Sequence, residues 1–322
     1  MLAEDALVEA LRSLVEHPRA PRVLLGIGDD AAVWQPSRAH RSVITTDALV
    51  ENVHFTRAMS FEQIGRRAMA SNLSDVAAMG ARPVLATIAL GLPPDVATAN
   101  VLELYRGMVA VCNDARFAIA GGDITRAPVL SIAIAVVGEV RPSNLKTRSG
   151  AKPGDVLAVT GALGASLAGL RGSQDAAALV AHRTPTARWR EGLWFGASRN
   201  VHAMMDLSDG LSTDLSRLCA RSLVGALVED VPVAPCLDAI AERDGEDPVD
   251  LALAGGEDFE LLVAIEPRAF GYLQARFAKC FGRPLHRVGT VREGSGLAVR
   301  KGSREEALLP SGWDHLGACS NR

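Results

Sequence analysis

The order of apolar and polar residues predicts alternating helices and strands in the first half of the chain. Residues 2–15, 61–80 and 95–115 carry apolar side chains at near-helical spacing, and Gly80 ends the second of these segments. Residues 42–50 are rich in β-branched side chains, which predicts a strand. Apolar runs bounded by turn residues predict further strands at residues 83–93, 117–123 and 129–140.

A polar, basic segment, "RPSNLKTRSGAKPGD" at residues 141–155, separates the two halves of the chain. Its glycines and prolines predict a domain boundary, and we divide the chain into residues 1–142 and 143–322. The sequence "VLAVTGALGASLAGL" that follows predicts a strand, a glycine turn and a helix, and residues 259–265 predict another strand. The alternation predicts an α/β protein, and a length of 322 residues favours two domains.

Composition and charge narrow the class of protein. Hydrophobic residues make up 48% of the chain and charged residues 22%, which is typical of a soluble globular protein with a core. A net charge of −3 provides no basic field for a nucleic-acid backbone, and apolar segments such as "VLSIAIAVVG" are too short to span a bilayer. The five cysteines are scattered without a C-x-x-C pair, which favours the reducing cytoplasm. We therefore expect a cytoplasmic protein that binds neither nucleic acid nor membrane.

Acidic residues recur in apolar or glycine-rich surroundings. The sequence "VLLGIGDDAAVW" places Asp29 and Asp30 directly after a glycine turn, where a dinucleotide-binding loop would receive phosphate. Two adjacent carboxylates would repel that phosphate unless a cation lay between them. The other acids in such surroundings are Asp47, Asp75, Asp123, Asp206, Asp209, Glu257 and Asp258.

Asp75 is the clearest case, because its neighbours Leu73, Val76 and Met79 are apolar. A buried carboxylate needs a partner, which can be backbone amides, an arginine or a cation. For one such residue the first two explanations suffice, but a series of them favours a divalent cation. Mg²⁺ prefers oxygen ligands, and no His or Cys cluster competes for a softer metal. Clusters that hold more than one Mg²⁺ usually serve phosphoryl transfer.

Two observations leave alternatives open. The sequence "DLSDG" can form a helix N-cap with acids at the positive end of the helix dipole, which is compatible with metal binding. The chain has no G-x-x-x-x-G-K-[ST] loop, and "ERDG" and "EDFE" are not protein-kinase signatures in these contexts. If the protein uses ATP, metal ions and the backbone of glycine residues must make most of the contacts with the phosphates of ATP.

Seven motifs in this order resemble the thiamine-monophosphate kinase family, and a C-terminal "GWDHL" extends the match over almost the whole chain. The motifs are "GIGDDAAV", "TTDALVENVHF", "NLSDVAAMGARP", "AGGDITR", "TRSGAKPGD", "MDLSDGLSTDL" and "LAGGEDFELL". The resemblance implies transfer of the γ-phosphoryl group of ATP to thiamine monophosphate with Mg²⁺, giving thiamine diphosphate. It also implies the two-domain α/β (α+β) fold of aminoimidazole ribonucleotide synthetase. In that fold the N-terminal domains pair across a homodimer and the C-terminal α/β domain covers the nucleotide cleft.

The resemblance assigns site residues by motif. The ligands of several Mg²⁺ ions would be Asp30, Thr45, Thr46, Asp47, Asp75, Asp123, Asp206 and Asp209. ATP contacts would be Tyr105, Gly122, Asp123, Arg148 and Ser208, and thiamine monophosphate contacts would be His54, Glu257 and Trp313. Without the resemblance, the Arg, Tyr, His and Trp of these sets would be interpreted as structural residues. Because the acceptor is already an ionised phosphate, we expect direct in-line transfer with no phospho-enzyme and no catalytic side chain.

Other proteins of the same fold are less compatible with the sequence. Hydrogenase maturation factors end in a reactive cysteine, whereas Cys319 is followed by three more residues. Selenophosphate synthetases need an N-terminal cysteine or selenocysteine, whereas the first cysteine here is Cys112. An ATP-dependent cyclo-ligase of the aminoimidazole ribonucleotide synthetase type remains the alternative enzyme. The non-enzyme alternative is a thiamine-phosphate or nucleotide sensor, which would not need so many carboxylates, and turnover would distinguish it.

Overall fold

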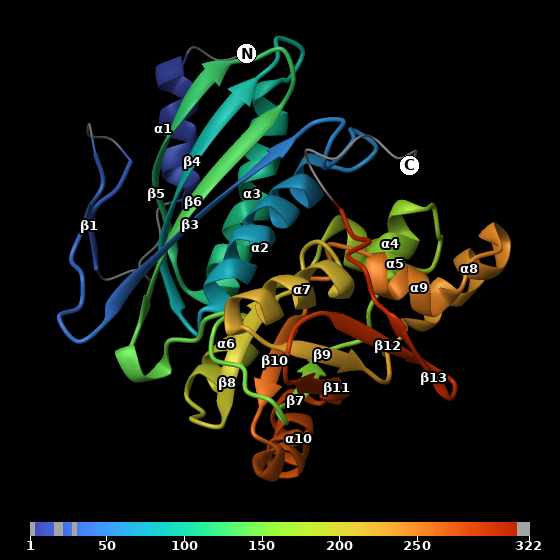
Figure 1. Cartoon of the computed structure of the whole chain (residues 1–322). Helices are drawn as coiled ribbons and strands as arrows, with labels where there is room; N and C mark the ends of the chain where they lie inside the picture. Colours follow the sequence, from blue (N-terminus) through green and yellow to red (C-terminus); the bar gives the residue numbers. More distant parts are fainter. Residues whose placement is uncertain (1–3, 16–21, 28–30, 314–322) are drawn as a thin grey trace. The chain divides into compact units, whose positions relative to one another are not determined.

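The structure, a computed structural model, describes residues 4–15, 22–27 and 31–313 (Figure 1). The chain forms two compact units, Met1–Leu145 and Lys146–Arg322, and the division lies inside the polar segment that predicted a boundary. We call them the N-terminal and the C-terminal unit. Within the described residues, no helix combines the length and the apolar character needed to cross a membrane.

The N-terminal unit is built on a four-stranded sheet in the order β3-β6-β4-β5, in which only β4 and β5 are parallel. Helices α2 and α3 pack on each other and α2 lies against the sheet (Figure 1). The sheet strands are β3 (Arg41–Val50), β4 (Arg82–Leu92), β5 (Ala118–Arg126) and β6 (Ser131–Val140). The helices are α1 (Glu4–Val15), α2 (Phe61–Ala78) and α3 (Thr98–Ala115), and β1 (Val23–Leu25) pairs with β2 (Val33–Trp34) in a separate ribbon.

The pair α2 and α3 makes unusually close backbone contact. A Cβ atom at Gly65 would lie 2.0 Å from the carbonyl oxygen of Leu104, and one at Gly107 would lie 2.1 Å from that of Glu62. Only glycine permits this approach from both helices. Ser60 starts α2 with a capping box, which satisfies two backbone N–H groups at that end.

The sheet of the N-terminal unit has one covered face and one open face. On β6, Ile132, Ile134 and Val136 are fully buried, as expected for side chains that face the helices. On β3, the alternate residues Ile44, Thr46 and Ala48 are exposed. Successive residues of β3 point to opposite faces of the sheet. Neighbouring site residues predicted on β3 therefore lie on different faces, one covered by the helices and one open.

The C-terminal unit contains a seven-stranded sheet in the order β13-β12-β9-β11-β7-β10-β8, antiparallel except between β12 and β9. Its strands are β7 (Val156–Val159), β8 (Val201–Asp206), β9 (Gly225–Val228), β10 (Leu261–Ile265), β11 (His286–Arg292), β12 (Leu297–Lys301) and β13 (Arg304–Ala307). Its helices are α4 (Ala165–Leu170), α5 (Ala176–Arg183), α6 (Trp189–Gly196), α7 (Leu211–Ser222), α8 (Asp238–Asp244), α9 (Pro248–Ala254) and α10 (Pro267–Phe281). Short 3₁₀ turns form at Pro142–Asn144 and Pro235–Leu237. Strands β7, β8 and β10 are buried on both faces, apart from partly exposed His202, and contribute to one continuous apolar core.

Several element boundaries differ from the sequence predictions by one to three residues, and local contacts or backbone angles explain three of them. Strand β5 continues three residues further, to Arg126, because it stays paired with β4 up to Leu92. Helix α3 begins later than residue 95, since the Asn100 side chain accepts the backbone N–H of Ala97 and fixes the start there. Strand β10 begins after residue 260, because Phe259 has a φ of 49° and cannot be part of an extended strand.

Candidate functional site

In the N-terminal unit, strand β3 is joined to helix α2 by two polar contacts. The hydroxyl of Thr45 donates to the carboxylate of Asp75 at 2.5 Å, and the backbone N–H of Asp47 donates to the side-chain oxygen of Asn72 at 3.0 Å. Residues two apart on a strand share a face, and so do residues three apart on a helix. Thr45 and Asp47 therefore lie on the helix-facing side of β3, beside Asp75.

Asp75 has the partner that its apolar neighbours required. It is half-buried and accepts the Thr45 hydroxyl, a residue 30 positions away in the sequence. Asn72, which is completely buried, is fixed by donating to the carbonyl oxygen of Ala68 at 3.0 Å. The sequence analysis did not single out Asn72, although it lies one helical turn before Asp75 in "NLSD".

Two other predicted metal ligands of this unit lie on the opposite, open face of the sheet. Thr46 is exposed and follows Thr45 directly, so its side chain points away from α2. Asp123 on β5 is also exposed and pairs with Ala89, an exposed residue of β4. Within the parts of the chain that are described, no three His, Cys, Asp or Glu side chains come together closely enough to hold a metal ion. Asp30, like Asp29, lies outside the described residues.

In the C-terminal unit, the "DLSDG" loop is organised by an acid that the sequence analysis did not single out. Asp214, completely buried in the first turn of α7, accepts the backbone N–H groups of Ser208 at 3.0 Å and Asp209 at 2.9 Å. Arg217 bridges the carboxylates of Asp214 and Asp209. Burial raises the pKa of Asp214 to about 6. Asp206, the last residue of β8, is 4% exposed at the base of this loop.

The "GGED" loop docks on the "DLSDG" loop through the backbone. The N–H of Glu257 donates to the carbonyl oxygen of Ser208 at 2.7 Å, and the N–H of Phe259 donates to that of Leu207 at 3.0 Å. The N–H of Trp313 donates to the carbonyl oxygen of Asp209 at 3.1 Å. This unit therefore brings predicted metal, nucleotide and substrate residues of three separate motifs together.

Glycines make this docking possible. A Cβ atom at Gly256 would lie 2.6 Å from the carbonyl oxygen of Ser208, and one at Gly312 would lie 1.7 Å from that of Asp209. A side chain at either position would force the two loops apart. The glycines of "GGED" and "GWD" are therefore needed for backbone contact, which a sequence motif alone does not reveal.

The remaining predicted contacts lie in different environments. His54 is half-buried, and its Nδ1 accepts the backbone N–H of Val50 at 3.0 Å, which leaves the proton of the neutral ring on Nε2. Tyr105 is only 3% exposed in α3, and burial raises the pKa of its hydroxyl. Gly122 faces the backbone of β4, with room for no side chain, since a Cβ atom would lie 2.0 Å from the carbonyl oxygen of Ile88. The side chain of Arg148 is exposed. The ligand roles of all these residues stay predictions.

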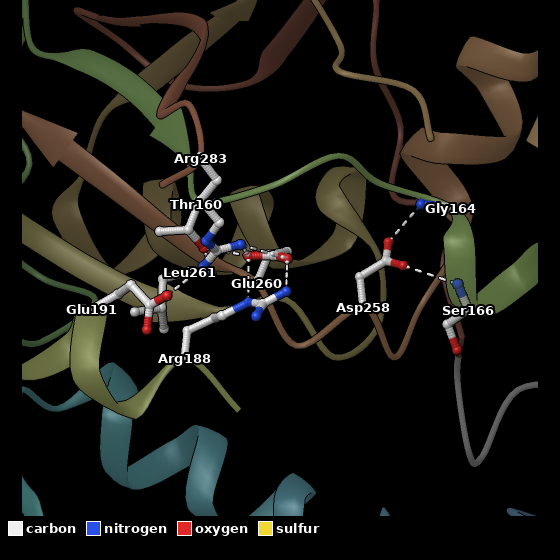
Figure 2. A network of polar contacts seen from close by, with 9 residues as sticks. All are labelled: Thr160, Gly164, Ser166, Arg188, Glu191, Asp258, Glu260, Leu261 and Arg283. Carbon is white, nitrogen blue, oxygen red and sulfur yellow. Dashed lines mark hydrogen bonds and ion pairs between the residues drawn. The ribbon is translucent and has the colours of Figure 1, made fainter. Parts of the chain in front are cut away.

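A buried ionic network is centred on Glu260, two residues after Asp258 in the chain (Figure 2). Glu260 is 4% exposed and accepts two hydrogen bonds from Arg188, at 2.9 and 2.5 Å, and one from the Thr160 hydroxyl at 2.6 Å. Arg283 lies within 3.2 Å of the same carboxylate. Burial favours the neutral acid, but the arginine charges outweigh it and lower the pKa of Glu260. The sequence analysis missed this network, because its members are far apart in the chain.

Comparisons with known proteins support the fold and the family resemblance. Residues 28–140 match the model of the AIR synthase related protein N-terminal domain, and residues 152–302 match that of its C-terminal domain. The thiamine-monophosphate kinase of Rhodopirellula baltica is 38% identical over 307 residues, which cover 92% of each chain. These matches confirm the predicted two-domain fold, while the predicted pairing of N-terminal sheets across a dimer stays a prediction.

Solved structures agree with the sequence relatives. Thiamine-monophosphate kinase from Stenotrophomonas maltophilia K279a is similar with a TM-score of 0.81 at 35% identity, over 92% of this chain and 96% of that one. AaThiL complexed with AMPPCP and TMP is similar with a TM-score of 0.76 at 30% identity, over 98% and 97% of the two chains. The resemblance seen in the motifs is thereby confirmed, and the chain belongs to the thiamine-monophosphate kinase family within the AIR synthase related proteins.

Proposed function

We propose that this protein transfers the γ-phosphoryl group of ATP to thiamine monophosphate in the presence of Mg²⁺ and produces thiamine diphosphate. One structural observation carries the proposal: the backbone of the predicted substrate residue Glu257 is bonded to that of the predicted nucleotide residue Ser208. Membership of the family over almost the whole chain supports it, as does the similarity to AaThiL complexed with AMPPCP and TMP.

The residues beside Asp75 fit a hard divalent cation. Thr45, Asp47 and Asp75 offer only oxygen donors on one side of β3, and the hydroxyl of Thr45 already contacts Asp75. Mg²⁺ is usually bound by one or two carboxylates, with phosphate and water supplying the other ligands, so three acids in one place are not required. When bound, the metal would neutralise phosphate charge. In the C-terminal unit, Asp206 and Asp209 are the proposed ligands, with Asp209 held by Arg217.

The substrate contacts follow from charge. Thiamine monophosphate joins an anionic phosphate to a cationic thiazolium ring. The Nε2–H of His54 can donate to an anionic oxygen, while the Glu257 carboxylate and the Trp313 ring suit the cationic ring. The ionised phosphate of the substrate is the nucleophile, so the side chains position the reactants and need not remove a proton. We therefore propose direct in-line transfer.

We also propose that the N-terminal unit pairs with a second copy of the chain. Its sheet has an open face on which Ile44 is 72% exposed, with the small exposed residues Ala48 and Ala89 on the same face. In the described part of the chain, the ten-residue strand β3 is an edge strand that pairs only with β6. Long edge strands and bare apolar faces are features that proteins usually cover.

The activity is tested by incubating the protein with ATP and thiamine monophosphate, with and without Mg²⁺, and separating the products by chromatography. Thiamine diphosphate and ADP formed in equal amounts, and only with the metal, would support the proposal. A folded protein that binds both substrates without turnover would favour the sensor. ATP hydrolysis only with formylglycinamidine ribonucleotide would favour the cyclo-ligase. The cytoplasmic location, inferred from cysteine usage, stays a prediction.

A further inference from the structure

The loop that carries Glu257 has an unfavourable backbone conformation. Glu257 has a φ of 63° and Phe259 a φ of 49°, and both are non-glycine residues in the left-handed region. Side chains other than glycine rarely adopt this conformation, and such residues persist only where the surroundings enforce it. The question is which contacts hold this loop.

Two acids on alternate positions provide those contacts (Figure 2). The Asp258 carboxylate accepts the backbone N–H of Gly164 at 2.7 Å and that of Ser166 at 3.2 Å, both at the start of α4. Glu260 is fixed by Arg188 and the Thr160 hydroxyl. Asp258 thus lies between the two strained residues and attaches the loop to α4, while Glu260 anchors its end to the sheet.

We propose that Asp258 is a positioning residue for thiamine monophosphate binding, which acts by holding Glu257 in its left-handed conformation against Ser208. The inference rests on the proposed function, because it assigns Asp258 a role in presenting a substrate contact. It goes beyond that function, because Asp258 itself need not touch the substrate. Glu260 forms the fixed end of the loop, and Asp258 determines the direction in which the Glu257 side chain leaves the backbone.

The competing explanation is that Asp258 merely stabilises the start of α4. The chain offers a matched control for it. One carboxylate oxygen of Asp175, at the start of α5 in the same unit, accepts the backbone N–H groups of Ala177 at 2.8 Å and Ala178 at 3.2 Å, which are nearly the same distances. Asp175→Asn therefore makes the same substitution, with the same loss of charge at a helix start, at a residue that lies outside the strained loop.

Steady-state kinetics separate the two explanations. In Asp258→Asn, an NH₂ group replaces one of the two acceptor oxygens and opposes a backbone N–H. We expect the KM for thiamine monophosphate to rise about tenfold, the lower end of the effect seen when a group that orients a metal ligand is lost, with a smaller change in the KM for ATP. Asp258→Glu, which keeps the charge and both oxygens, should give an intermediate value. Asp175→Asn should leave both KM values unchanged.

Hydrogen exchange provides a readout that does not depend on kinase activity. The amides of Glu257 and Phe259 donate to Ser208 and Leu207, so they should exchange slowly in the wild type and in Asp175→Asn. Both should exchange faster in Asp258→Asn. Unchanged exchange and an unchanged KM in that variant would overturn the inference, as would equal effects in Asp175→Asn.

The two measurements also distinguish failure of the inference from failure of the proposed function. If the wild type does not convert thiamine monophosphate, the function fails, while hydrogen exchange still shows whether Asp258 holds the loop. If Asp258→Asn does not fold, Asp258→Glu takes its place in both assays. If Asp258→Glu folds and shows the exchange rates and KM of the wild type, Asp258→Ser is measured next. Wild-type exchange rates and KM in both of these variants would overturn the inference.

Discussion

The backbone N–H of Glu257 donates a 2.7 Å hydrogen bond to the carbonyl oxygen of Ser208, although the two residues are 49 positions apart. This bond joins the loop after α9 to the loop after β8. It places one residue predicted to contact thiamine monophosphate next to one predicted to contact ATP. The arrangement gives several expectations for variants of both loops and of the N-terminal unit.

Asp75→Asn should abolish turnover while leaving the protein folded. Asparagine has nearly the same shape and can still accept the Thr45 hydroxyl, but it lacks the negative charge that Mg²⁺ requires. We expect kcat to fall on the order of a hundredfold or more at saturating Mg²⁺. Asp114→Asn, which changes an exposed carboxylate of α3, is the control. Near-normal activity of Asp75→Asn would show that Asp75 is not a required metal ligand.

Gly256→Ala should destabilise the protein and weaken substrate binding together. The added Cβ atom would lie 2.6 Å from the carbonyl oxygen of Ser208, so the two loops must separate. We expect a loss of about 1–3 kcal/mol in the free energy of unfolding, measured by urea titration. Gly271→Ala in α10 is the contrasting control, because nothing lies within 4 Å of the new atom and alanine favours helix. It should stabilise the protein by up to about 1 kcal/mol.

Replacements of Glu257 should reveal its strained backbone. Both Glu257→Ala and Glu257→Gly remove the carboxylate and should weaken thiamine monophosphate binding alike. The glycine variant should be more stable than the alanine variant by about 1 kcal/mol, since the φ of 63° at position 257 suits glycine. At Glu242, inside helix α8, the alanine variant should be more stable than the glycine variant, because alanine favours helix. The same order at both sites would contradict the strained conformation.

Stability should depend on pH through Asp258. Burial raises the pKa of this acid from 3.8 to about 7, so the folded state retains the proton at pH values where the unfolded chain has released it. The folded state then binds more protons, and its stability falls as the pH rises between about 4 and 7. Urea titrations without metal should show that the wild type loses stability relative to Asp258→Asn over this range. A constant difference between the two proteins would contradict a raised pKa.

Ile44→Glu should disrupt the proposed dimer. The substitution puts a charge on the open face of the sheet, on the edge strand β3 itself, where the apolar side chain of Ile44 is 72% exposed. Light scattering after gel filtration should show a dimer for the wild type and a monomer for the variant. Val180→Glu, which alters another exposed apolar residue on α5, should leave the mass unchanged. A monomeric wild type would contradict the proposed dimer.

The sequence by itself determined the main helices and strands of the N-terminal unit and the motifs that carry the family. Segments such as residues 42–50 and 61–80 could be predicted because periodicity and glycine stops act over a few residues, where neighbours in the chain are neighbours in space. The motifs around Asp75, Asp209 and Glu257 also carried the resemblance that the comparisons confirmed.

Only the tertiary structure decided which of those residues meet. Thr45 contacts Asp75 whereas Thr46 points to the other face, a difference that depends on the pairing of β3 with α2 rather than on the motif "TTD". Glu260 finds Arg188 72 residues away, and strands must pair before that contact exists. Long-range contacts such as these leave no local pattern, because the free energy that fixes them comes from packing and pairing of the whole unit.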